Sequence, residues 1–367
     1  MSLFLAGLLA LTSGSAAAAP VVADPAATTA QAADQAAYQA AMRELVRTLR
    51  DSASPRDRAL ASQLLPVVPA TDGSEPASAE QAASGKLLRA AAQAAPDDAL
   101  VQALWVNADP RLSGCDVKNP CPRRADALAR LQPDNAAAWV PLVDAAWQRK
   151  DTAGIDAALA KMAKARDYDD FLGQALKAWM DVYARHPLPV PTSDPAAARF
   201  SPRATALVAA MGMASATALS PFDKVVKSCQ RQMNPDAPPS RFRDCAQIGR
   251  TLLVHGDSLL GRMIGRGLLR VSGQATPADV EPARNAQWQQ ENWMRLTATA
   301  DPARLDAAAA DWANASNEMA VLQIQFQRAG IALTPPAGWM AHNSRGEPVP
   351  PLGEVAPGSG KLEPNRR

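Results

Sequence analysis

A seven-residue pattern that recurs in this chain constrains its fold more than any other feature. Residues 98–104 read DALVQAL and residues 170–176 read DFLGQAL, so both fit D-x-L-x-Q-A-L at an offset of 72 residues. Half of that offset, 36 residues, leads to Asp134, where the Asp is kept but the Leu and the Gln are lost. A period near 36 residues is the size of a two-helix repeat, whose units bury their apolar faces only against neighbouring units. The pattern therefore predicts stacked helical hairpins.

Alanine supports the same fold class. The chain holds about 80 Ala residues, whereas aromatic residues make up only 5% of it. Ala is the best helix former and a poor strand former, which excludes an all-β fold. The segments Pro96–Asp98 and Pro133–Asn135 each end in a side chain that can accept hydrogen bonds from the free N–H groups of a helix start. We therefore predict an all-α protein with helices beginning at these two positions.

The predicted hairpins resemble tetratricopeptide repeats. Trp139 and Leu142 lie three residues apart, as in the first helix of that motif. Ala158, Met162 and Ala165 have the small–bulky–small spacing of its second helix. The chain departs from the motif after Leu142, where a bulky Val replaces a small residue, and in about three extra residues between the two helices. The resemblance covers residues 96–185, a quarter of the chain, and implies an α-solenoid-like array that binds peptides or proteins.

Proline-rich and glycine-rich stretches indicate how the chain is organised. The segment HPLPVPTSDP begins at His186, and such a density of proline ends helices and marks a boundary. Beyond it, long stretches of periodic apolar residues predict a bundle of longer antiparallel helices. The predicted regions are a flexible lead-in at 24–35, a helical-repeat-like region at 36–185, a linker at 186–202, a C-terminal helical bundle at 203–333 and a disordered Pro/Gly-rich tail at 334–367.

Two stretches of the predicted bundle carry more detail. Large apolar residues recur every seven residues at 302–329, which predicts one continuous helix with a narrow apolar seam. They are Leu305, Trp312, Met319 and Phe326. The stretch 242–271 contains five glycines, each of which costs helix stability relative to Ala. These glycines either allow close contact between helices or mark a turn that splits the stretch into a hairpin, and we favour close packing.

The N-terminus predicts export. Residues 3–11 are an uninterrupted apolar run, LFLAGLLAL, followed by small residues up to Ala19, which is the pattern of a secretory signal at 1–23. Nine apolar residues are too few to cross a bilayer, so we expect no stable transmembrane anchor. No Lys or Arg precedes Arg43, which departs from the usual signal; the alternative is an Ala-rich disordered N-terminus. We predict a periplasmic or secreted protein.

The four cysteines form two local pairs. Cys115 and Cys121 flank one short loop, and Cys229 and Cys245 flank a second, Pro-rich loop. We predict the disulfides Cys115–Cys121 and Cys229–Cys245, which fit an oxidising compartment. The alternative is a zinc site, but the C-x-x-C spacing typical of such sites is absent. We therefore expect no metal.

Charge and motif searches narrow the function classes. The chain carries 38 basic and 36 acidic residues, a formal charge of +2, which argues against a nucleic-acid binder because phosphates require a basic surface. It contains only three His residues, too few for a local multi-histidine metal site. No motif of a nucleophilic enzyme or of a cofactor-binding loop stands out, and we expect no cofactor.

The candidates for catalysis are few. His255 falls on an apolar stripe with Ile248, Leu252 and Leu259, so it is expected to face the core or a cleft. With Asp257 or Asp244 as an orienting partner it would be a general base; the alternative, which we favour, is a buried histidine with no catalytic role. Glu291 is a second weak candidate. Either residue would make the protein a hydrolase of envelope polymers.

The candidates for binding lie at 285–293, where Trp288, Gln290 and Trp293 stand among amides. Tryptophan rings in such a setting stack on sugars or peptides. The two Trp residues diverge on a helix, however, and one or both can anchor the core instead. We expect a non-catalytic, exported helical scaffold that binds a protein or peptide partner in a bacterial-type envelope. The alternatives are the hydrolase and a carrier of small ligands with a pocket between the C-terminal helices.

Overall fold

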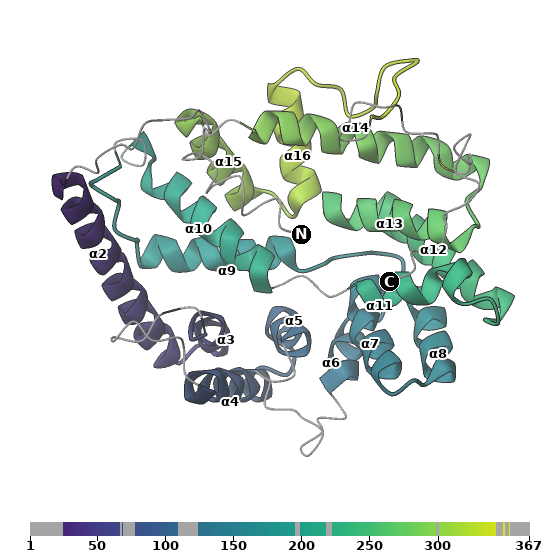
Figure 1. The fold of residues 1–367 in the computed structure, drawn as a ribbon, viewed down its shortest axis with the longest axis horizontal. Helices are drawn as coiled ribbons and strands as arrows, with labels where there is room; N and C mark the ends of the chain where they lie inside the picture. Colours follow the sequence, from purple (N-terminus) through teal and green to yellow (C-terminus); the bar gives the residue numbers. More distant parts are fainter. Residues whose placement is uncertain are drawn as a thin grey trace.

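The computed structural model describes residues 25–66, 68, 78–108, 124–194, 199–217, 222–298, 301–342, 348 and 352. Within these residues the chain forms fifteen α-helices, short 3-10 turns and no β-strand (Figure 1). The predicted all-α class is therefore confirmed. The helices are α2 (Pro25–Arg50), α3 (Pro55–Leu64), α4 (Ser78–Ala94), α5 (Ala99–Asn107), α6 (Arg124–Leu131), α7 (Val140–Gln148), α8 (Thr152–Met162), α9 (Leu172–Arg185), α10 (Pro202–Thr217), α11 (Asp223–Cys229), α12 (Pro239–His255), α13 (Leu259–Ser272), α14 (Val280–Thr297), α15 (Pro302–Asn314) and α16 (Glu318–Arg328).

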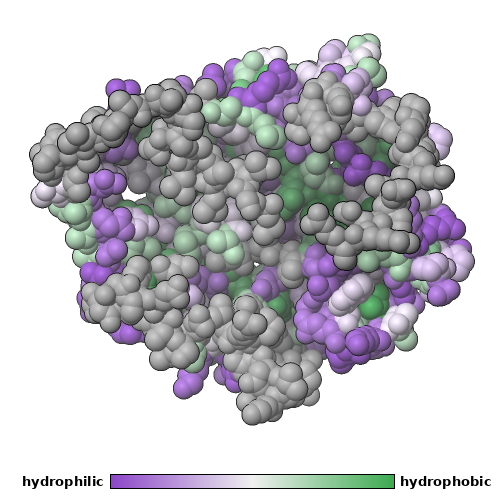
Figure 2. Space-filling model, in the orientation of Figure 1, coloured by the Kyte–Doolittle hydropathy of each residue, from purple (hydrophilic) through white to green (hydrophobic). Residues whose placement is uncertain are grey.

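Helices that follow one another pack as hairpins. The pairs α3–α4, α5–α6, α7–α8, α9–α10, α12–α13 and α15–α16 all make contact. In Figure 1, α3 to α8 form an arc along one side, α9 and α10 cross the middle, and α12 to α16 complete the other side. In the same view the surface over α7 and α8 is mainly polar, whereas hydrophobic atoms gather near the centre of the face (Figure 2).

The helix starts predicted from the recurring pattern are present. The side chain of Asp98 accepts a hydrogen bond from the Val101 N–H at the start of α5. Asn135 likewise accepts one from the Ala137 N–H, in the 3-10 turn that precedes α7. Both side chains satisfy N–H groups that have no partner within the helix, which is the physical reason for the pattern.

A continuous hydrophobic core joins both parts of the chain. It runs from Met42 in α2 to Phe326 in α16, with Trp179 of α9 among its fully buried side chains. Helices on either side of the predicted linker contact each other, since α7 packs on α11, α8 on α12 and α9 on α10. The predicted regions 36–185 and 203–333 thus share one core.

The glycine-rich stretch is both a hairpin and a close contact. The turn at Gly256–Ser258 separates α12 from α13. Where the two helices cross, a Cβ atom on Gly265 would lie 2.6 Å from the carbonyl oxygen of Gly249, and one on Gly249 would lie 2.9 Å from that of Gly265. Both alternatives left open by the sequence therefore apply: Gly256 lies in the turn of the hairpin, and Gly249 and Gly265 allow the close contact between its helices.

Three predicted boundaries differ from the structure. The stretch 302–329 is two helices, because Asn317 caps α16 through the Ala320 N–H and such side chains compete with helical hydrogen bonds. The predicted lead-in is helical from Pro25 onward, consistent with its alanine content. Residues 334–342, predicted as part of a disordered tail, lie along α14.

Some predictions fall on residues outside the described ranges. They are the signal segment at 1–23, the Cys115–Cys121 pair and most of the tail beyond 342. Among the helices that the structure describes, none combines the length and the apolar character needed to cross a membrane.

Candidate functional site

The α14 helix separates the two tryptophans that the sequence singled out. Trp293 is 7% exposed and belongs to the core, whereas Trp288 is half-buried on another side of the helix. Five residues along an α-helix correspond to a rotation of about 140°, so the two rings point in different directions. Gln290, on the same helix, is half-buried. Of the three predicted binding residues, Trp288 is the one whose side chain hydrogen-bonds to a non-helical segment.

That segment, residues 331–342, is called the strap. It follows α16 and passes over α14, as the yellow trace at the top of Figure 1 shows. The indole Nε1 of Trp288 donates to the carbonyl oxygen of Ala332 at 2.7 Å, and Nε2 of Gln289 donates to that of Leu333 at 3.0 Å. Two consecutive side chains of α14 therefore bind the main chain at the beginning of the strap.

The far end of the strap is bound in the same way. Nη1 of Arg284 lies 3.2 Å from the carbonyl oxygen of Trp339 and 3.5 Å from that of Pro336. The main-chain N–H of His342 donates to Oε1 of Glu291 at 3.2 Å. The hydrogen bonds of these four α14 side chains to the strap thus all go to main-chain groups, which are common to all peptides.

Few side chains of the strap are buried. Pro335 and Ala341 are buried, while Leu333 and Met340 are exposed, the latter by 55%. The ring of Trp339 meets that of Trp288 edge-on, with centroids 5.4 Å apart, a favoured geometry for aromatic pairs. Recognition of the strap therefore combines main-chain hydrogen bonds, one aromatic contact and two small buried positions.

The strap-binding residue Gln289 of α14 is itself bound by Arg262 of α13. Oε1 of Gln289 accepts a hydrogen bond from Nη1 of Arg262 at 3.2 Å, and Nε of the same arginine donates to the carbonyl oxygen of Gly256 at 3.1 Å. Burial lowers the pKa of Arg262. Because its carboxamide oxygen is occupied, Gln289 presents its NH₂ group to the strap in a fixed orientation.

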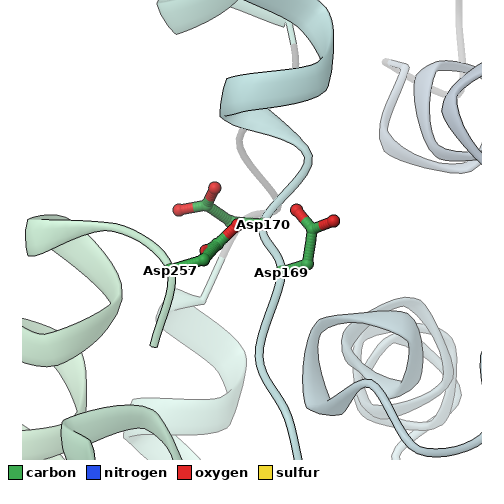
Figure 3. A group of neighbouring side chains, drawn as sticks. All are labelled: Asp169, Asp170 and Asp257. Atoms are coloured by element: carbon green, nitrogen blue, oxygen red, sulfur yellow. The ribbon is translucent and has the colours of Figure 1, made fainter. Parts of the chain in front are cut away.

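A second cluster, here called the acidic junction, consists of Asp169, Asp170, Asp257 and Glu318. Carboxylate oxygens of the three aspartates lie within 4.8 Å of one another. The side chain of Asp257 extends from the α12–α13 turn toward the loop that carries the other two (Figure 3). Glu318 is the first residue of α16. Three distant segments of the chain therefore bring their carboxylates together.

Hydrogen bonds join these segments. The main-chain N–H of Asp257 donates to the carbonyl oxygen of Tyr168 at 3.1 Å, and that of Met319 donates to the carbonyl oxygen of Asp257 at 3.1 Å. Oε2 of Glu318 accepts from the Leu259 N–H at 2.9 Å. The junction thus connects the α8–α9 loop, the α12–α13 turn and the start of α16.

Asp170, Asp257 and Glu318 of the junction have raised pKa values. Burial raises the pKa of Asp257 and of Asp170, and the charge of Asp170 raises that of Asp257 further. Burial also raises the pKa of Glu318 to about 7. No Lys or Arg among the described residues forms an ion pair with them. Burial favours the neutral form of these three groups, because a buried charge without a partner is costly.

Most oxygens of the junction already have donors. Ser258 Oγ donates to Asp170 Oδ2, and Asp169 Oδ2 accepts from Gln174 Nε2 at 2.6 Å. Asp257 Oδ1 is buried without a partner. Oxygen ligands of this kind suit Ca²⁺ or Mg²⁺, and a shared proton satisfies the same oxygens. The hydrogen bonds identify the junction first as a structural connection between segments.

The predicted catalytic residues lie apart from one another. His255, expected to face the core or a cleft, is exposed at the end of α12, because the helix ends there and the chain turns at Gly256. Asp257 belongs to the acidic junction, and Glu291 binds the strap. These residues therefore form no common site that would support the hydrolase hypothesis. Sequence reasoning missed Asp169, Asp170 and Glu318, although Asp170 opens the second copy of the recurring pattern.

A shallow groove lies on the outer face of α12. Its volume is about 400 Å³, and Arg243, Arg250, Gln274 and Thr276 are among its lining residues. Arg250 is held by both carboxylate oxygens of Asp279, at 3.0 and 3.1 Å. The groove is open to solvent, so it encloses no ligand and gives the carrier hypothesis little support.

The predicted Cys229–Cys245 disulfide is confirmed. The two Cα atoms are 5.6 Å apart, and the bond links the end of α11 to α12.

The described residues offer two candidate sites, the strap-binding face of α14 and the acidic junction. No protein-family model, curated protein or solved structure matches this chain.

Proposed function

We propose that this chain is an exported, non-catalytic helical scaffold of a bacterial-type envelope that binds non-helical segments of partner proteins on α14. One observation carries the proposal: Arg284, Trp288 and Gln289 donate hydrogen bonds to main-chain carbonyl groups of the strap. A partner peptide has the same carbonyl groups, so it can be bound by the same side chains. The hairpins that precede α14, which resemble tetratricopeptide repeats at 96–185, would supply a rigid frame.

Two features support the export part of the proposal. The apolar run at 3–11 and the small residues after it have the pattern of a secretory signal. The disulfide between Cys229 and Cys245 fits an oxidising compartment, such as the periplasm or the exterior of the cell. Fusing residues 1–30 to a reporter enzyme that is active only after export would test this part. An inactive reporter would contradict it.

A peptide-display selection tests the binding part. The oxidised full chain is used as bait for a random peptide library, and enriched peptides are measured again by fluorescence anisotropy. We expect that Trp288→Ala weakens their binding about tenfold, because it removes a hydrogen bond and an aromatic contact. Met294→Ala is the matched control on the same helix, since Met294 is 56% exposed and its side chain makes none of the hydrogen bonds to the strap. Peptides that bind both variants as tightly as the original chain would overturn the proposal.

A further inference from the structure

We infer that the strap is a built-in competitor for the peptide site of α14 and that a partner displaces it with a Pro-Ala-Gly-Trp turn of the same kind. The inference rests on the proposed function, because it concerns the regulation and the ligand class of that same site. It is carried by the contacts between α14 and the strap, by the sparse burial of the strap and by the geometry of its ends.

The contacts of the strap can be replaced. The side chains of α14 bind it through the carbonyl oxygens of Ala332, Leu333 and Trp339 and through one N–H. A peptide from another molecule offers the same groups at no additional cost in desolvation. The strap itself is twelve residues long; only Pro335 and Ala341 are buried, and Ile331 at its start packs partly against the core. Segments with so few buried contacts open at a small fraction of the global unfolding free energy.

The strap can leave without disturbing α16. Gly330, with φ of +68°, lies between the helix and the strap, and no atom lies within 4 Å of where its Cβ would be. The Ile331 N–H donates to the carbonyl oxygen of Phe326 at 2.9 Å, which closes the end of α16 in the manner of a helix C-cap. Ile331 therefore stays with the end of α16, and the strap can separate from Ala332 onward without breaking this cap.

The shape of the strap defines the ligand class. Gly338 has φ of +75°, and the Trp339 N–H donates to the carbonyl oxygen of Pro336 at 3.2 Å, which is a β-turn with its glycine in the left-handed position. The turn directs the ring of Trp339 onto Trp288. A competing ligand would need a buried proline, a glycine turn, a Trp directly after it and a small residue two positions later.

A labelled peptide tests the inference on the oxidised full chain. The probe is IALTPPAGWMAH, the sequence of residues 331–342, and its affinity is measured by fluorescence anisotropy. We expect Trp339→Ala in the chain to tighten binding of the probe about 2- to 10-fold, because the internal competitor loses its aromatic contact. Met340→Ala, which changes an exposed residue of the strap, is the matched control and should leave the affinity unchanged. Trp288→Ala should weaken binding in every background.

Hydrogen exchange supplies a second measurement. Adding the probe should increase exchange at the main-chain amides of residues 331–342, while the amides of α14 remain protected. If Trp339→Ala lowers the melting temperature, Ala341→Arg serves instead, since it places a large side chain at a buried position of the strap. Either variant weakens the strap and leaves the α14 side chains intact.

The outcomes separate this inference from the proposed function. Binding that depends on Trp288 but is equal in the original chain and in Trp339→Ala overturns the competition and leaves peptide binding in place. Binding that is absent in all variants, or that survives Trp288→Ala, overturns both. A dimer that grows with concentration when the strap is weakened would mean that two copies exchange straps, and it would overturn displacement by a separate partner.

Discussion

Gly265 of α13 lies directly against Gly249 of α12, so that neither position has room for a side chain. A Cβ atom on Gly265 would come within 2.6 Å of both the carbonyl oxygen of Gly249 and the main-chain nitrogen of Leu253. These neighbours are backbone atoms, which move only if the two helices move apart. The close crossing therefore depends on both glycines, and it positions the α12–α13 turn that carries Asp257.

Replacing Gly265 with Ala should destabilise the protein by about 1–3 kcal/mol, the usual cost of overpacking. Gly267→Ala is the matched control, because no atom lies within 4 Å of its Cβ position and Ala favours the helix by about 0.5–1 kcal/mol. Urea unfolding followed by circular dichroism gives both values. Equal effects of the two substitutions would contradict the close crossing.

The acidic junction should make stability depend on pH. Burial raises the folded-state pKa of Glu318 from 4.5 to about 7, so the folded protein holds a proton that the unfolded chain releases between these values. Stability should therefore fall as the pH rises from about 4.5 to 7, and then level off for this group. Glu318→Gln should remove up to about 3 kcal/mol of this loss. The measurement is urea unfolding at pH 5 and at pH 8.

Asp257→Asn should act in the same direction over a wider range. The pKa of Asp257 is raised by burial and by the neighbouring Asp170, so the penalty continues to grow above neutral pH. The variant should be stabilised more at pH 8 than at pH 5. His255→Ala, which changes an exposed residue two positions away, should leave the slope of stability against pH unchanged between pH 7 and 8. A larger stabilisation of Asp257→Asn at pH 5 would contradict the assignment.

Ser258 should be the most sensitive polar residue of the junction. Its hydroxyl donates to Asp170 and also accepts from the Gly261 N–H as the cap of α13. Ser258→Ala should cost about 1–3 kcal/mol, because a buried carboxyl group and a helix start both lose a partner. Ser272→Ala is the control: this serine is also buried, but its hydroxyl contacts only Leu269 of its own helix. Thermal unfolding of both variants at pH 6 is the measurement.

Removing the Cys229–Cys245 disulfide should cost about 3 kcal/mol, the value for a loop of about 15 residues in the chain-entropy model. The double variant Cys229→Ser, Cys245→Ser should unfold at the same urea concentration as the reduced original chain. An original chain whose stability is unaffected by reduction would show that the bond is not formed in solution.

Sequence patterns correctly predicted the features that depend on contacts between residues close together in the chain. Asp98 and Asn135 cap helices as their sequence setting indicates, and the disulfide joins cysteines 16 positions apart. The acidic junction could not be found in this way, since Ser258 is 88 residues from Asp170 and Leu259 is 59 residues from Glu318. The exposed position of His255 was not predicted, because the apolar stripe used to place this residue does not continue past the turn at Gly256. Trp288 hydrogen-bonds to Ala332, which lies 44 residues further along the chain, so its partner could not be predicted from the local sequence either.

The shared core has a consequence for how the chain is made. The helices α7, α8 and α9 bury apolar side chains against α11, α12 and α10, all of which are synthesised later. Until about a hundred further residues have emerged, these apolar surfaces have no covering and can associate with other molecules. The first half of the chain therefore needs either rapid synthesis of the second half or a chaperone that holds it unfolded. A fragment that ends near residue 190 should be insoluble when it is expressed alone.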